Sequence, residues 1–138
     1  MPYQSPNSQD AALDYIKSNA DRAIYTNGEP SDYAEADTPH DSGNSTTTFK
    51  VAERPVVLSS FVGPEDFTDS NGSGRKIVLK KGGWLGLDDA EVGFIALVDD
   101  DGEELLAVSD AATPVSVQEG FAYNNLEADF KQYDAEVV

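Results

Sequence analysis

Side chains that commonly perform acid–base or nucleophilic chemistry are scarce in this sequence. His40 is the only histidine, and it lies between Pro39 and Asp41 in a stretch that we expect to be a loop. A histidine base needs a nearby nucleophile and a rigid element to hold it, whereas the chain has no cysteine and no Gly-x-Ser-x-Gly motif. The segment from Gly72 to Lys76 lacks the spacing of a phosphate-binding loop. We therefore expect an exposed His40, no catalytic residue and a protein that is not an enzyme.

Acidic residues are abundant enough to raise the question of a cation site. The best candidate is the run Asp99-Asp100-Asp101-Gly102-Glu103-Glu104. An EF-hand calcium loop aligned on its glycine would put Leu97 at the first ligand position and Val108 at the last, so the motif fails. A second run, Asp69 to Gly74, has Lys80 where the glutamate ligand belongs. We expect no metal or cofactor site, a hairpin tip kept soluble by charge, and at most weak Ca²⁺ or Mg²⁺ binding.

Composition excludes several classes of partner. The 138 residues suggest one domain, and their 26 Asp and Glu against 9 Lys and Arg give a net charge of −17. Nucleic acids and anionic membranes attract basic proteins, so we expect neither as a partner. No signal peptide or membrane span is visible, since the longest apolar run is only Val92 to Val98. The acidity has three candidate causes: a saline environment, the solvated outside of an assembly, or attraction to a basic partner.

Aromatic residues in irregular segments indicate interaction better than catalysis. Trp84, the only tryptophan, lies with Leu85 in the glycine-rich segment from Lys81 to Leu87, where it could be a core plug or an interface anchor. Phe61 and Phe67 flank a Gly-Pro pair and could pack beneath that loop or against a neighbour. An N-terminal arm without a core of its own could order on a partner. The predicted partner or oligomer contacts are Tyr3, Pro6, Phe61, Phe67, Trp84 and Leu85.

The chain reads as an arm followed by one folded unit. We assign residues 1–10 to a flexible N-terminal arm and residues 11–138 to a single β-rich domain. A short helix capped at Asn7 or Ser8 is expected near this boundary, with Leu13, Ile16 and Ala20 forming one apolar stripe. Two long loops are expected at residues 29–48 and 63–74, because both are rich in Gly, Pro, Ser, Asn and Asp.

Strand patterns dominate the remainder. A turn at Asp100-Asp101-Gly102 should join two of the strands as a hairpin, and Pro55 suggests that its own strand is an edge strand or bends. Several strands at short spacing with Gly and Pro between them predict a mostly β, antiparallel sandwich or barrel-like domain with a short N-terminal helix. The expected strands cover residues 22–26, 49–58, 76–80, 91–99, 103–109, 114–118 and 121–130.

A set of short motifs resembles small proteins of tailed phages that are encoded among head and tail genes. Each motif is short, and their order and spacing from Leu13 to Phe130 carry the resemblance. The motifs are Ala20-Asp21-Arg22, Glu29-Pro30-x-x-Tyr33-x-Glu35-Ala36, Gly74-Arg75-Lys76-Ile77-x-Leu79, Phe94-x-Ala96-Leu97-Val98-Asp99, Leu105-Leu106-Ala107-Val108, Thr113-Pro114-Val115-x-Val117 and Gly120. The segment from Thr38 to Thr48 and the acidic load depart from the family pattern. The resemblance implies a structural role in the virion and no catalytic residue.

These observations predict a non-enzymatic viral structural protein, a capsid decoration or cement subunit on the outer surface of the virion, assembled in the host cytoplasm. Its expected partners are the major capsid protein or neighbouring virion proteins, and a homotrimer is the expected oligomer because small decorating domains form closed symmetric rings. The alternatives are a tail, neck or fibre component, or a host-attachment module that binds carbohydrate or Ca²⁺ with Trp84 as a stacking platform.

Overall fold

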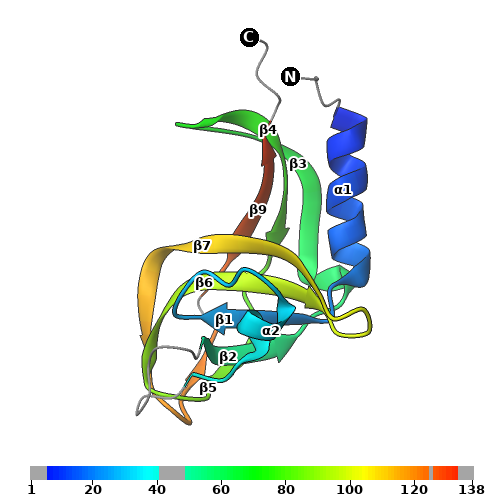
Figure 1. Cartoon of the computed structure of the whole chain (residues 1–138). Helices are drawn as coiled ribbons and strands as arrows, with labels where there is room; N and C mark the ends of the chain where they lie inside the picture. Colours follow the sequence, from blue (N-terminus) through cyan, green and yellow to red (C-terminus); the bar gives the residue numbers. More distant parts are fainter. Residues whose placement is uncertain (1–5, 41–48, 125, 134–138) are drawn as a thin grey trace.

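The computed structural model describes residues 6–40, 49–124 and 126–133. Within these ranges the chain is mostly strand, with one long helix at the start (Figure 1). The elements are α1 (Pro6–Asn19), β1 (Arg22–Thr26), α2 (Tyr33–Asp37), β2 (Lys50–Pro55), the 3-10 turn η1 (Leu58–Ser60), β3 (Phe61–Asp69), β4 (Gly72–Leu79), β5 (Trp84–Gly86), β6 (Ala90–Asp99), β7 (Glu104–Val117), β8 (Ala122–Tyr123) and β9 (Ala128–Tyr133).

The strands form two antiparallel sheets. The larger sheet has the order β7-β6-β1-β2-β5-β8, and the smaller has the order β3-β4-β9. Figure 1 shows α1 lying alongside the smaller sheet, which stands above the larger one. The expectation of a mostly β, antiparallel, sandwich-like fold with an N-terminal helix is confirmed.

The core lies between the two sheets and beneath α1. The apolar stripe predicted for the helix is buried, since Leu13, Ile16 and Ala20 are at most 8% exposed. They pack with buried residues of both sheets, among them Tyr25, Ile77 and Phe130. A smaller cluster fills the space between the larger sheet and α2; its members are Ile24, Ala36, Ala96 and Val98. No helix in the described ranges is long and apolar enough to cross a membrane.

The helix begins earlier than the sequence predicts. α1 starts at Pro6, so residues 6–10 of the predicted arm are part of the helix, and residues 1–5 lie outside the described residues. Proline is well suited to the first turn of a helix, because the amide hydrogen that it lacks would have no partner there. Asn7 and Ser8, the residues expected to cap the helix, therefore lie within its first turn.

Both predicted loops contain regular structure. The first holds α2, where the side chain of Asp32 caps the helix by accepting a hydrogen bond from the backbone N–H of Glu35; residues 41–48 of that loop are outside the described residues. The second is the β3–β4 hairpin, closed by the pair Asp69 and Gly72. Exposed residues such as Asp66, Thr68 and Ser73 alternate there with half-buried or buried ones such as Phe67 and Gly74.

Two further strand assignments change. The strands predicted at 103–109 and 114–118 are one long strand, β7, and the strand predicted at 121–130 is divided into β8 and β9. β2 lies between β1 and β5, so it is not an edge strand; Pro55 is its last residue. A proline is accommodated at that position because the strand ends there.

Candidate functional site

Two of the predicted contact residues belong to the core. Trp84 is 4% exposed, and its ring stacks between those of Tyr25 and Tyr123 at centroid distances of 4.5 Å and 4.7 Å. Phe61 is 7% exposed. Trp84 is thus the core plug rather than the interface anchor, and it cannot serve as a stacking platform for a sugar. The sequence misleads here because the flanking glycines suggest an irregular exposed segment, whereas β5 turns the tryptophan inward.

The other predicted contacts do not form one surface. Leu85, on the opposite side of β5 from Trp84, is 48% exposed. Phe67 is half-buried on β3, where its ring meets the edge of the Tyr133 ring at 5.1 Å. Pro6 is the first residue of α1, and Tyr3 lies outside the described residues. Leu85 is therefore the one member of this set that the structure places with a largely exposed apolar side chain.

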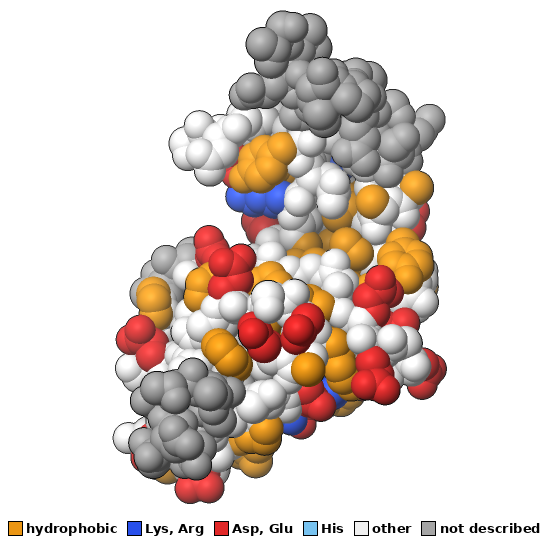
Figure 2. Space-filling view, in the orientation of Figure 1, with side chains coloured by type: hydrophobic (Ala, Val, Ile, Leu, Met, Phe, Trp, Pro, Cys, Tyr) orange, Lys and Arg blue, Asp and Glu red, His pale blue; other side chains and the backbone are white. Residues whose placement is uncertain are grey.

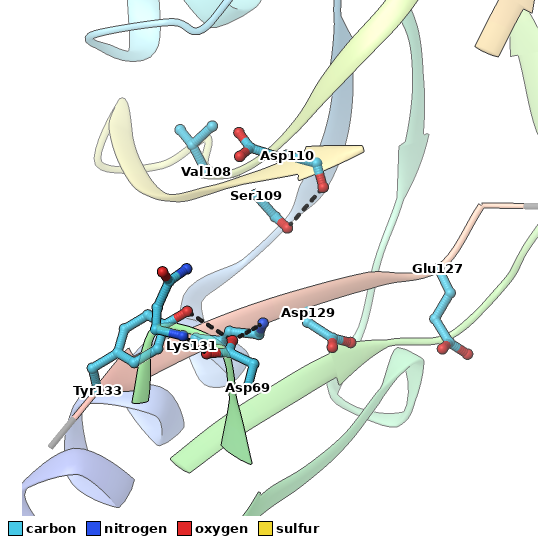
Figure 3. Close-up of a pocket in the computed structure, with 9 residues that line it drawn as sticks. Asp69, Val108, Ser109, Asp110, Glu127, Asp129, Lys131 and Tyr133 are labelled. Atoms are coloured by element: carbon cyan, nitrogen blue, oxygen red, sulfur yellow. Dashed lines mark hydrogen bonds and ion pairs between the residues drawn. The ribbon is translucent and has the colours of Figure 1, made fainter. Parts of the chain in front are cut away.

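A polar cleft lies where β7 of the larger sheet passes β9 of the smaller one (Figure 3). Its volume is about 600 Å³, which is within the range of small-molecule sites. Figure 3 shows Lys131, Tyr133 and Asp69 together on one side, with residues 108–110 of β7 facing them. The lining residues are Asp69, Asn71, Val108, Ser109, Asp110, Glu127, Asp129, Lys131 and Tyr133.

Asp69 is the electrostatic centre of this cleft. Its carboxylate accepts hydrogen bonds from Lys131 Nζ at 2.6 Å, the Asn71 amide at 2.8 Å and the Tyr133 hydroxyl at 2.9 Å. These bonds, the one from Lys131 above all, lower the pKa of Asp69 from 3.8 to about 2. Asp69 in turn raises the pKa of Lys131. Both groups remain charged at neutral pH and bind each other.

Two of the carboxylates that line the cleft are bound to lysines. A glycosidase needs one carboxyl group that stays protonated to act as an acid, but Asp69 is held ionised and Asp129 is paired with Lys76 at 3.0 Å. The Ser109 hydroxyl donates to the backbone carbonyl of Asp110 at 3.3 Å, and no base in the described residues contacts it. The groups that line the cleft could hydrogen-bond a polar ligand.

His40 differs from the expectation of an exposed loop residue. Its side chain is only 8% exposed, and its Nδ1 lies 2.8 Å from Oδ2 of Asp88. The backbone N–H of His40 also donates to the carbonyl of Lys50 at 2.8 Å. The histidine therefore ties the segment before β2 to the β5–β6 connection, an arrangement that a sequence separation of 48 residues conceals.

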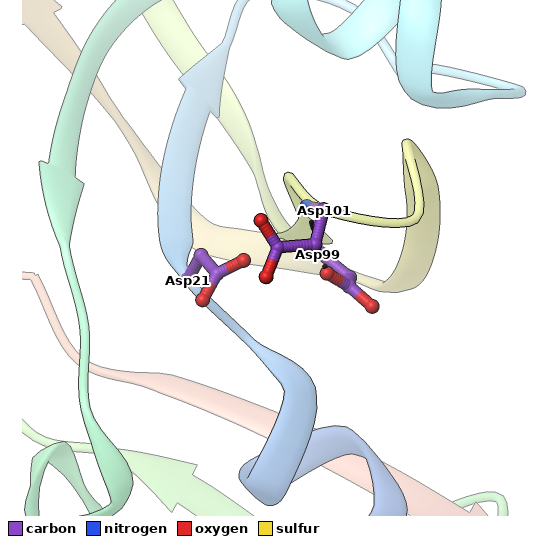
Figure 4. A group of neighbouring side chains, drawn as sticks. All are labelled: Asp21, Asp99 and Asp101. Atoms are coloured by element: carbon purple, nitrogen blue, oxygen red, sulfur yellow. Dashed lines mark hydrogen bonds between the residues drawn. The ribbon is translucent and has the colours of Figure 1, made fainter.

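Three carboxylates gather where β1 begins beside the β6–β7 turn (Figure 4). The oxygens of Asp21, Asp99 and Asp101 lie within 4.8 Å of one another, and the predicted Asp-rich turn supplies two of the three. The turn is present as expected, although its left-handed residue is Glu103, at φ 49°, rather than Gly102. We call Asp21, Asp99 and Asp101 the acidic trio. Such a group could hold a cation, but its ligand spacing is not that of an EF-hand.

The larger sheet also carries an ionic network on its outer face that the sequence does not predict. Arg22 donates to Asp37 at 2.8 Å, to Glu53 at 2.5 Å and three times to Asp100, at 2.7 Å, 3.0 Å and 3.1 Å. Lys50 adds bonds to Asp37 and Glu53. The network joins α2, β1, β2 and the β6–β7 turn. Its partners lie up to 78 residues apart in the sequence, so no local pattern could have revealed it.

Comparison of the chain with protein-family models, with curated proteins and with solved structures gives no match. The resemblance to tailed-phage proteins therefore stays a prediction.

Proposed function

We propose that this chain is a non-enzymatic structural protein of a tailed-phage-like virion, a decoration subunit that binds the outer shell. The observation that carries the proposal is the presence of two separate surfaces with exposed large apolar residues. One, the β5–β8 surface, consists of Leu85, Leu87 and Phe121, which are 48%, 42% and 59% exposed. The other consists of Val57 and Leu58 at the connection between the sheets. A subunit that cements a shell must contact both the shell and a neighbour, so two such surfaces fit the role.

The β5–β8 surface is the better candidate for the shell contact. Leu85 and Leu87 are two residues apart in extended chain, and the backbone N–H of Gly86 between them donates to the carbonyl of Phe121 at 3.0 Å. The three apolar side chains thus come from two adjoining segments that are fixed by backbone hydrogen bonds. Acidic side chains are scattered over the face seen in Figure 2 and outnumber the basic ones there, and the net charge of −17 favours solubility on the outside of a particle.

The proposal is tested by the number of copies in purified particles. Quantitative mass spectrometry would compare this protein with the major capsid protein in the particle fraction of its source. Hundreds of copies per particle support a shell-wide role, about a dozen would instead indicate the tail or neck, and complete absence would overturn the virion proposal. Rebinding to particles that lack the protein refines the test. Leu85→Asp should abolish rebinding, while Val62→Asp, at a similarly exposed position on β3, should not.

Host attachment is the second candidate, and the cleft between β7 and β9 is the observation that favours it. Its carboxylates and the Tyr133 hydroxyl match the hydrogen-bonding groups of a sugar. Thermal stabilisation by a glycan or by Ca²⁺, lost in a Tyr133→Phe/Glu127→Gln variant, would favour attachment over decoration.

A further inference from the structure

The connection between the two sheets presents an apolar surface in a fixed conformation. Val57 and Leu58 are 63% and 60% exposed, the highest values among the large hydrophobic residues in the described ranges. The turn that carries them is held at both ends, because the Val57 amide donates to Ser60 Oγ at 3.0 Å and the Ser60 amide donates back to the Val57 carbonyl at 2.8 Å. We call Val57 and Leu58 the junction patch.

Two lysines, Lys80 and Lys81, lie near one end of the turn that carries this patch. The backbone N–H of Lys80 donates to the carbonyl of Ser60 at 2.9 Å, which places Lys80 and Lys81 beside the turn. All nine Lys and Arg residues are in the described ranges, and seven of them form ion pairs or side-chain hydrogen bonds. Lys80 and Lys81 are the two without such a partner there, and both are exposed. In a chain of charge −17, these two lysines are available for an external acidic group.

Acidic side chains lie near the other end of the turn. The backbone N–H of Val56 donates to the carbonyl of Asp21 at 3.0 Å, so the acidic trio adjoins the start of the same turn. None of its three carboxylates forms an ion pair with a described cation. Tyr15 extends this side; it is 52% exposed and donates to Glu104 at 2.8 Å. Figure 1 shows the β6–β7 turn close to the C-terminal end of α1, where the helix leads into β1.

We propose that the junction patch is a two-fold interface between two copies of this chain. A two-fold axis through Leu58 would bring the apolar patches of both copies together and would place Lys80 and Lys81 of each copy over the acidic trio of the other. An interface of this kind must be self-complementary, and a patch with opposite charges on its two flanks meets that requirement. Each contact would also relieve the repulsion within one trio.

The same arrangement argues for a dimer rather than the trimer expected from the sequence. A threefold ring joins two different surfaces of each subunit, whereas here both charged groups flank one patch. The inference does not rest on a virion role, because it concerns only contacts between copies of the purified chain. If the purified chain does not dimerise, the proposed binding to a shell is unaffected. If the chain is absent from virus particles, the proposed dimer is unaffected.

The test is the mass of the purified full chain in solution, measured by sedimentation velocity over a concentration series at near-physiological ionic strength. We expect a dimer for the unaltered protein. Leu58→Asp should weaken dimerisation at least about tenfold, since a charge then enters the centre of an apolar contact. Leu87→Asp, a matched change on the β5–β8 surface, should leave it unaltered. Circular dichroism would establish that each variant is folded.

A charge exchange then tests the pairing itself. Lys80→Glu/Lys81→Glu and Asp21→Lys/Asp101→Lys should each be monomeric alone. An equimolar mixture should form a mixed dimer, because one of its two ionic contacts is restored with opposite sign and the other keeps its original sign. The side chain of Asp21 also accepts a hydrogen bond from the backbone N–H of Asp100, so changing it could prevent folding. In that case Asp101→Lys alone replaces the double variant in the mixing experiment. A monomer at every concentration, a trimer, a dimer that survives Leu58→Asp, or a mixture that does not associate would overturn the inference.

Discussion

The Arg22 network offers the sharpest test of what holds this fold together. Arg22→Met keeps most of the aliphatic stem. Among the described residues it leaves Asp37 and Glu53 with Lys50 as their cation and Asp100 without an ion pair. Removing one partner costs about 3–5 kcal/mol in a buried ion pair, while an exposed pair contributes about 0–1 kcal/mol. The side chains here are between these limits, with Arg22 20% exposed and the carboxylates 30–36% exposed.

We therefore expect Arg22→Met to lower the free energy of unfolding by about 2–3 kcal/mol, or the melting temperature by about 10 °C. Urea denaturation followed by circular dichroism would measure it. Lys81→Met is the matched control, because it changes the net charge equally but removes an exposed side chain without an ion pair. At low protein concentration its effect should stay within about 0.5 kcal/mol.

The pH dependence of this difference identifies its cause. Hydrogen bonds from Arg22 lower the pKa of Asp100, and those from Arg22 and Lys50 outweigh the effect of burial to lower the pKa of Asp37 as well. A carboxyl group with a lowered pKa stabilises the fold above its unfolded value of 3.8 and loses that contribution as the pH falls through the folded value. The difference in the free energy of unfolding between the wild type and Arg22→Met should therefore become smaller below about pH 4. A gap that is constant with pH, or no larger than that of the control, would refute the electrostatic explanation.

Three further predictions concern single side chains. Trp84→Ala empties the space between two stacked tyrosines and should cost about 3–5 kcal/mol, measured by urea denaturation, with Trp84→Phe costing less. Lys131→Met removes the main hydrogen bond to Asp69, whose pKa should rise from about 2 towards 3.8 in an NMR titration. Gly74→Ala would drive its methyl group into the backbone carbonyl of Gln132, so it should lower the melting temperature, whereas Gly83→Ala has open space and should not.

Local periodicity explains why part of the fold could be predicted. Leu13, Ile16 and Ala20 repeat at helical spacing, and all three are buried as expected. The continuous apolar run at residues 92–98 likewise predicts a strand, which is β6 and lies between β1 and β7. In contrast, residues 63–74, which form most of β3 and the start of β4, read as a loop because this outer half of the hairpin lacks a continuous apolar face. That half is stabilised by backbone pairing and by distant contacts such as Lys131 with Asp69, 62 residues away.

The candidate sites were less predictable for the same reason. The Asp-rich turn is visible in the sequence, but its third carboxylate, Asp21, comes from the start of β1 and is brought near only by the pairing of β1 with β6. The pairing of His40 with Asp88, 48 residues away, also cannot be predicted from the residues around either of them. Whether Trp84 faces the core or a partner depends on one residue of strand register, since Leu85 beside it faces the other way. Local composition cannot decide a choice of that kind.

The use of the few cations connects stability with interaction. With 26 acidic and 9 basic residues, each cation placed within the fold leaves the remaining surface more negative. Arg22, Lys50, Arg75, Lys76 and Lys131 all pair with carboxylates across separate elements, so positive charge is used mainly to join parts of the chain. Lys80 and Lys81 contribute no such link, yet they stand beside the most exposed apolar residues of the described chain. If stability alone governed their placement, these lysines would be expected near unpaired acids of their own copy; their position is explained if those acids belong to a second copy.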